Sequence, residues 1–140
     1  MTLSLVSPKD VPYVWTEVKP LIEKALVYTA GEALVEDVLK LILEKDQMLW
    51  VGTNDDDEIF CAATTEVIGY PRKNVFRIVT FATKSGHDYE MWKDFIHTIE
   101  DCAIVCECTS IEAWVRKGLA RKLKWEHEYS VITKNIQEDY

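Results

Sequence analysis

Residues 75–103 read VFRIVTFATKSGHDYEMWKDFIHTIEDCA, and this stretch decides the fold class. Its first part, Val75–Phe81, is rich in β-branched and aromatic residues, which predicts a strand. After a loop that contains Gly86, apolar residues recur at intervals of three and four, which predicts an amphipathic helix over Asp88–Ala103. Another strand is predicted around Thr109–Trp114. The helix is therefore expected to cross over between two parallel strands.

The rest of the chain supplies further strands and helices on both sides of this unit. Upstream, the sequence predicts a short strand, two amphipathic helices and two more strands: Leu3–Val6, Val11–Ala25, Leu34–Lys45, Met48–Val51 and Ile59–Ile68. Pro20 falls inside the first helix and is expected to kink or split it. Downstream, it predicts a basic helix over Arg116–Leu123 and a last strand over Glu128–Thr133. The order β-α-α-β-β-β-α-β-α-β predicts one α+β domain over residues 1–140, with a mixed sheet and helices on both faces.

Length and composition are those of a globular protein. The 140 residues are 48% hydrophobic and 29% charged, which excludes a disordered or collagen-like chain. The net charge of −8 argues against a nucleic-acid partner, because an acidic chain repels the phosphate backbone. No apolar run reaches the roughly 18–20 residues of a membrane span, and the first eight residues lack the features of a signal peptide. We therefore expect a cytoplasmic protein without a membrane partner.

The cysteines do not form a recognisable metal motif. Cys61, Cys102, Cys106 and Cys108 lack the C-x-x-C spacing and the fourth ligand of a zinc knuckle. We expect reduced, buried thiols and no bound metal. The sequence also lacks a P-loop, an H-E-x-x-H motif and a Ser-His-Asp signature.

Several spaced groups of residues carry a resemblance to a known family. They are residues 14–26 (VWTEVKPLIEKAL), Leu49–Val51, Thr65–Glu66 with Tyr70–Arg72, and Cys108–Glu112 with Arg116–Gly118. Together with the element order, they resemble the GNAT superfamily of N-acetyltransferases, and specifically the small GNAT-like proteins that tailed bacteriophages and prophages encode. The resemblance covers nearly the whole chain.

The resemblance implies a fold, a cofactor and a reaction. In this superfamily the fourth and fifth strands splay apart and admit the pantetheine arm of acetyl-CoA or another acyl-CoA. Backbone N–H groups at the start of the following helix hold the pyrophosphate, and an acceptor amine attacks the thioester. The residues that the resemblance places at the cofactor are Phe81, Thr83, Lys84, Ser85, Gly86, His87, Asp88, Arg116 and Lys117.

The resemblance also suggests residues for the acceptor. Glu66 is a candidate general base, because it lies late in its strand, where this fold often places one; the alternative is a solvent-facing glutamate. Tyr70 and Arg72 are candidate substrate residues, and the alternative is ordinary turn chemistry around Pro71. The basic residues from Arg116 onward could clamp a phosphate or could simply be a solvated helix.

The sequence departs from the family pattern at two places. The pyrophosphate loop is usually Q/R-x-x-G-x-G/A, whereas residues 83–88 read TKSGHD and match it only at Gly86. Asp88 would put a carboxylate beside a diphosphate, a repulsion that Lys84 offsets in part. The tyrosine that often protonates the leaving thiolate falls on Ala120 or Lys124.

Two functions therefore stay open. One is an N-acyltransferase with a degraded cofactor loop, whose partner is an amine substrate. The other is a catalytically inactive GNAT-fold phage protein, whose partner is a host or virion protein. Either would work in the cytoplasm of a bacterial cell, and the second could also be associated with the virion.

Overall fold

A computed structural model describes residues 2–27, 33–84, 88–113, 124–125, 132, 134 and 136. Its elements are β1 (Thr2–Val6), a 3-10 turn (Pro8–Asp10), α1 (Val11–Leu26), α2 (Val35–Leu43), β2 (Met48–Thr53), β3 (Ile59–Tyr70), β4 (Lys73–Thr83), α3 (Asp88–Val105) and β5 (Ser110–Ala113). The predicted helix over 116–123 and the predicted strand over 128–133 lie outside the described residues.

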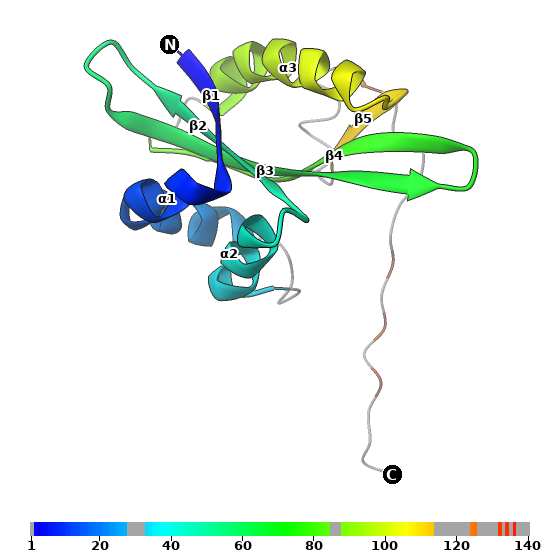
Figure 1. Ribbon diagram of the computed structural model, residues 1–140, viewed down its shortest axis with the longest axis horizontal. Helices are drawn as coiled ribbons and strands as arrows, with labels where there is room; N and C mark the ends of the chain where they lie inside the picture. Colours follow the sequence, from blue (N-terminus) through cyan, green and yellow to red (C-terminus); the bar gives the residue numbers. More distant parts are fainter. Residues whose placement is uncertain are drawn as a thin grey trace.

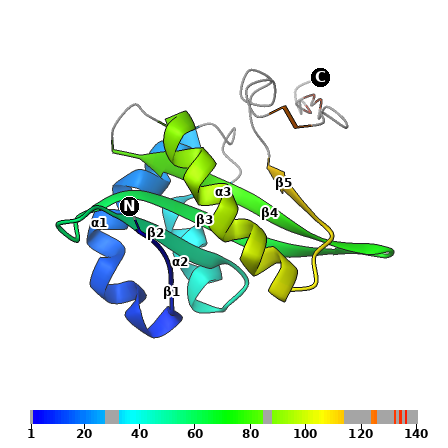
Figure 2. The same ribbon diagram turned by 90° about the horizontal axis from the view of Figure 1, so that it is seen from above.

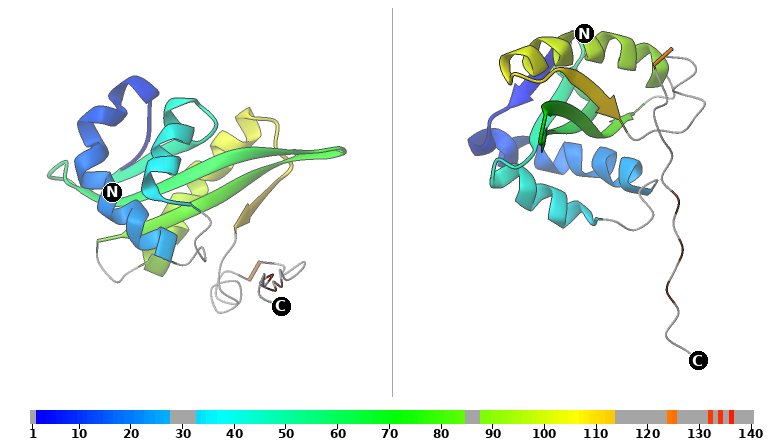
Figure 3. Two further views of the ribbon diagram at one scale, coloured as in Figure 1. Left: turned by 90° about the horizontal axis from the view of Figure 1, so that it is seen from below. Right: turned by 90° about the vertical axis from the view of Figure 1, so that its right-hand side faces the viewer.

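The five strands form one mixed sheet in chain order, β1-β2-β3-β4-β5 (Figure 1). The first four strands pair antiparallel, and β5 pairs parallel with β4 after the α3 crossover. Helices α1 and α2 cover one face of the sheet and α3 lies on the other (Figure 3). The predicted α+β class, the meander and the helical crossover are confirmed.

Two apolar clusters hold the layers together, one on each face. Between the sheet and α1 with α2, the cluster is built on buried aliphatic residues such as Val18, Ile22 and Leu49. Beneath α3 it is largely aromatic and contains Trp50, Phe76, Trp92 and Phe95. Where the helices cover both faces of β3 and β4, these strands are largely buried on both sides rather than alternating.

The sequence predicts that Pro20 kinks or splits the first helix, and of these two effects the split is wrong. Helix α1 continues through Pro20 to Leu26. Pro20 and Thr16, whose carbonyl loses the usual i→i−4 hydrogen bond, are both exposed, so water can satisfy that carbonyl. The helix is held instead by its buried side, where Val18 and Leu21 pack against the sheet.

The β3–β4 hairpin is longer than its sequence indicates. Tyr70, expected in the turn, is the last residue of β3 and pairs with Lys73, which leaves only Pro71 and Arg72 in the turn. The tip of this hairpin extends past the helices that cover the rest of the sheet (Figure 1). None of the described helices is long and apolar enough to cross a membrane.

Candidate functional site

A β-bulge interrupts β4, which lies between β3 and β5 in the sheet. Thr64 of β3 pairs with Thr80, but the next residue, Thr65, pairs with Ile78. Val79 is therefore the extra residue on β4, and its backbone lies outside the regular ladder with β3. On the other edge of β4, the described parallel ladder with β5 ends at the pair Ile78 and Ala113. The bulge thus follows directly on the last described pair between β4 and β5, two strands that lie side by side in Figure 2.

Two threonine hydroxyls fasten the bulge to β3. The Oγ1 atoms of Thr64 and Thr80 are 2.7 Å apart, and both side chains are buried. On the opposite face, the indole N–H of Trp50 donates to Thr65 Oγ1 at 3.0 Å. Since unpaired polar groups are costly in a protein interior, these bonds fix the register on both sides of the shift.

Two lysines lie where β4 ends. The Nζ of Lys24, on α1, donates to the carbonyl of Thr83 at 2.9 Å. Lys84 follows with an exposed side chain, and its backbone N–H donates to the carbonyl of Phe60 at 2.7 Å. Helix α3 then begins at Asp88, so its N-terminal end, which favours anions, follows Lys84 shortly in the chain.

The residues expected at the cofactor are distributed over different environments. Thr83 is the fully buried last residue of β4. The Phe81 ring packs against Trp92 and Phe95, with 5.2 Å between ring centroids in each case, so it belongs to the core beneath α3. Ser85, Gly86, His87, Arg116 and Lys117 lie outside the described residues, and Asp88 is described only as the first residue of α3.

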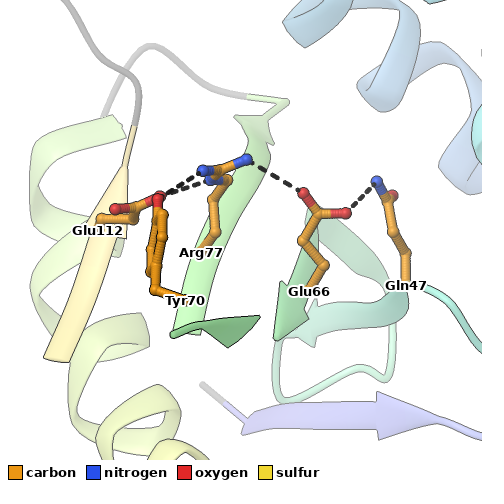
Figure 4. Close-up of polar contacts among 5 residues, drawn as sticks. All are labelled: Gln47, Glu66, Tyr70, Arg77 and Glu112. Carbon is orange, nitrogen blue, oxygen red and sulfur yellow. Dashed lines mark hydrogen bonds and ion pairs between the residues drawn. The ribbon is translucent and has the colours of Figure 1, made fainter. Parts of the chain in front are cut away.

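A charged row, made of Glu66, Arg77 and Glu112, crosses three neighbouring strands (Figure 4). Arg77 Nε donates to Glu112 Oε1 at 2.6 Å, and Arg77 Nη1 lies 3.5 Å from Glu66 Oε1. The register causes this alignment, because Arg77 is the ladder partner of both glutamates. The side chains are 16–24% exposed, so the row is half-buried.

Two further side chains continue the row at its ends. Beyond Glu66, the Nε2 of Gln47 donates to Glu66 Oε2 at 3.4 Å. On the other side, Arg77 Nη2 donates to the hydroxyl of Tyr70 at 3.3 Å. Burial alone lowers the pKa of Arg77, but the hydrogen bond and charge of Glu112, with smaller effects of Tyr70 and Glu66, raise it above its ordinary value. The guanidinium therefore remains charged.

The structure brings together some of the expected acceptor residues but not all. Glu66 and Tyr70 both contact Arg77, whereas Arg72 is an exposed turn residue. Sequence reasoning did not single out Gln47 or Arg77, and it named Glu112 only within the residues that carry the family resemblance. The opposite charges of Glu66 and Arg77 on strands joined by a predicted turn were the available signal, because they mark a cross-strand pair.

The thiols lie apart from the charged row. Cys61 is buried, and burial raises the pKa of its thiol to about 11. Cys102, Cys106 and Cys108 are half-buried near the end of α3. Burial raises the pKa of Cys102 to about 11, and the neighbouring thiols add to this. All four cysteines are free, and within the described ranges no group of His, Cys, Asp and Glu side chains is arranged to hold a metal ion.

Comparison with known proteins finds similarity in structure. No family model matches the sequence, and a search of curated proteins finds no match. A probable acetyltransferase aligns with a TM-score of 0.70 and 10% identity over 99% of this chain and 100% of that one. A tetramutant of the BH1408 protein from Bacillus halodurans aligns with a TM-score of 0.72 and 11% identity, over 97% and 100%.

Two of the similar structures have specified activities. A ribosomal-protein-alanine N-acetyltransferase from Brucella melitensis aligns with a TM-score of 0.70 and 10% identity, over 97% of this chain and 100% of that one. An aminoglycoside acetyltransferase from an uncultured soil sample, in complex with sisomicin, aligns with a TM-score of 0.66 and 15% identity, over 99% and 96%. At these identities the comparison establishes the fold. The chain has the α+β fold of the GNAT acetyltransferases.

Proposed function

We propose that the protein is an acyl-CoA-dependent N-acyltransferase, which transfers an acetyl or other acyl group to an amine. The observation that carries the proposal is the bulge at Val79, where β4 leaves its ladder with β3 next to the parallel pair β4–β5, in a fold shared with acetyltransferases. Bulges are over-represented beside active sites, where they redirect a side chain or end strand pairing, and they leave the extra residue unpaired. Fold alone does not define an activity, so the proposal depends on this local feature.

The residues around the end of β4 fit an anionic cofactor. When bound, acyl-CoA supplies the acyl group as a thioester that an amine can attack. In this chain, Val79 has no ladder partner on β3, so its backbone could face the cofactor. The start of α3 offers backbone N–H groups to a diphosphate. Lys84 and Lys24 add positive charge at the end of β4. These groups would bind and orient the cofactor.

Calorimetric titration with acetyl-CoA tests the proposal. We expect measurable heat of binding by the native protein and several-fold weaker binding by Lys84→Ala, because one cation near a phosphate is lost. Lys40→Ala is the matched control, since Lys40 is an exposed lysine on α2. Absence of heat with acetyl-CoA and with longer acyl-CoA esters would reject the acyltransferase.

A second candidate function is that of a non-catalytic phage or prophage protein that binds a virion or host protein. It is favoured by Thr83, which is buried at the position where the family loop carries a basic or amide residue, and by an aspartate at the first position of α3. It predicts a stable partner in affinity purification from infected cells or in purified virions. If the protein is absent from virions and no host protein co-purifies, this candidate fails.

A further inference from the structure

We propose that the outer edge of β1 is a dimerisation surface, at which β1 of a second copy of this chain pairs antiparallel across a two-fold axis. The two sheets then continue into each other through their first strands. The inference does not rest on the proposed acyl transfer, because it uses neither the charged row nor the end of β4.

The outer edge of β1 is open among the described strands. All five residues of β1 (Thr2–Val6) pair with β2, and no described strand lies on the other side of β1 (Figure 1). The N–H and C=O groups that face away from β2 therefore form a template for another extended strand. A second copy of the chain supplies such a strand with an open edge of its own.

The sequence of β1 has none of the features that usually protect an edge strand. Natural edges are blunted by charged residues, by proline or by a bulge. Thr2–Val6 reads TLSLV, without a charge or a proline, and its pairing with β2 is regular over its whole length. Because a chain with a net charge of −8 repels a second copy over much of its surface, an uncharged strand is a favourable place for two copies to meet.

The side chains of β1 show which face of the sheet the contact extends. Leu3 packs against the cluster beneath α3, and Val6 packs against the cluster on the opposite face. Leu5 lies two residues from Leu3 and therefore on the α3 side, opposite Trp50 in the ladder. Its side chain is nevertheless 49% exposed, so this face of the edge carries an apolar group that the described chain does not cover.

The strand is complementary to itself in this register. A two-fold axis through Ser4, the middle residue of β1, pairs Leu3 of one copy with Leu5 of the other on the same face of the joined sheet. Leu3 borders an open hollow whose other lining residues belong to α3: Asp94, His97 and Thr98. Pairing therefore places the exposed leucine of each copy beside the hollow of the other.

The same register brings opposite charges together at both ends of the paired strands. Thr2 pairs with Thr53, so the exposed acidic turn of residues 55–58 lies just past the N-terminal end of β1. In the antiparallel pair, the C-terminal end of the second β1 lies there and leads into the exposed Lys9 and the N-terminus of α1. Both favour neighbouring carboxylates, and Asp10 offsets part of this attraction.

Sedimentation velocity of the full chain over a series of concentrations tests the proposal. At about 0.15 M salt, where screening acts over about 8 Å, we expect reversible conversion of monomer to dimer as the concentration rises. We expect no larger species, because a two-fold contact uses the open edge of both copies. A chain that stays monomeric up to several hundred micromolar would overturn the proposal, and so would growth beyond the dimer.

Hydrogen exchange shows whether β1 makes the contact. The N–H groups of β1 that face away from β2 have no strand partner among the described residues. In the dimer they are bonded to the second β1, so at dimer concentrations they should exchange about tenfold or more slowly than in dilute protein. A dimer in which these amides remain unprotected uses another surface and refutes the proposal.

A charge placed on the edge tests the apolar part of the contact. Leu5→Lys should weaken dimerisation about tenfold or more, because edge lysines oppose strand pairing. Val67→Lys is the matched control, since Val67 is 41% exposed and lies on β3 beyond its last pair with β2. Unchanged dimerisation by folded Leu5→Lys, or an equal loss in the control, would contradict the proposal.

A charge reversal tests the register. Lys9→Glu should weaken dimerisation several-fold, and Lys40→Glu, which changes the net charge by the same amount at an exposed position on α2, should weaken it less. Adding Asp56→Lys to Lys9→Glu should restore most of the association, because the two positions meet only between copies. If the double variant dimerises no better than Lys9→Glu alone, the two-fold register through Ser4 is refuted.

Discussion

The hydroxyl pair of Thr64 and Thr80 gives a quantitative test of how the bulge is held. Thr64→Val and Thr80→Val each remove one hydroxyl and keep the branched shape of the side chain, so neither leaves a cavity. Each single change leaves the other hydroxyl buried without its partner at 2.7 Å. The double change removes both hydroxyls and leaves an apolar pair of the same shape.

The size of the effect follows from this asymmetry. An orphaned buried hydroxyl costs about 1–3 kcal/mol, whereas replacing both partners with apolar groups is nearly neutral. We therefore expect each single variant to lose about 1–3 kcal/mol of unfolding free energy, and the double variant to lose less than about 1 kcal/mol. Both threonines are buried, so solvent cannot compensate for the lost bond.

Denaturant unfolding followed by tryptophan fluorescence measures these differences. Trp50 is buried and bonded to the adjacent Thr65, so its emission reports on this part of the sheet. The dependence of the free energy on denaturant should stay the same in all four proteins, since the surface exposed on unfolding is unchanged. A double variant that loses the sum of the two single losses would refute the reasoning, because the hydroxyls would then act independently.

Three other predictions concern stability. Gly52→Ala should lower the unfolding free energy by about 1–3 kcal/mol, because a Cβ at this position would clash with the sulfur of Cys61. Adding Cys61→Ala should restore most of this free energy, as measured by chemical unfolding. In the folded protein the pKa of Cys61 is about 11, above its ordinary value of 9.0. The thiol of the unfolded chain therefore loses its proton at lower pH, and the unfolding free energy should fall as pH rises from 9 to 11. This fall should be smaller in Cys61→Ala. Glu112→Gln should lower the unfolding free energy by about 1–3 kcal/mol, because the charged hydrogen bond between Arg77 and Glu112 is lost. An unchanged melting temperature would contradict this.

Part of the fold could be predicted because its signals are local. The helix over Asp88–Ala103 carries a regular apolar stripe, and the structure places α3 over Asp88–Val105. The bulge at Val79 has no such signal. The residues around the bulge, Ile78 to Ala82, are apolar or β-branched and are largely buried on both faces, so an extra residue leaves no visible break in their pattern.

The candidate site was harder to predict, because it depends on register. Glu66 could be named as a site residue from its place in a strand, but its partners could not. Arg77 meets Glu66 through an antiparallel ladder and Glu112 through a parallel one, and a shift by one residue would point either side chain to the opposite face. Gln47 precedes its strand and has no periodicity from which its burial could be inferred.

The order of strands in the sheet has a consequence for how the chain folds. The strands β2, β3 and β4 are joined by short turns, so their hairpins close over small loops, and such contacts form early. Strand β5 pairs with β4 only after the whole of α3 has been traversed. We therefore expect Arg77 to meet Glu66 first and Glu112 last. The pair of Arg77 with Glu112 would then form in the slowest step of folding, and a partly folded chain would already hold its meander with the pair of Arg77 and Glu66.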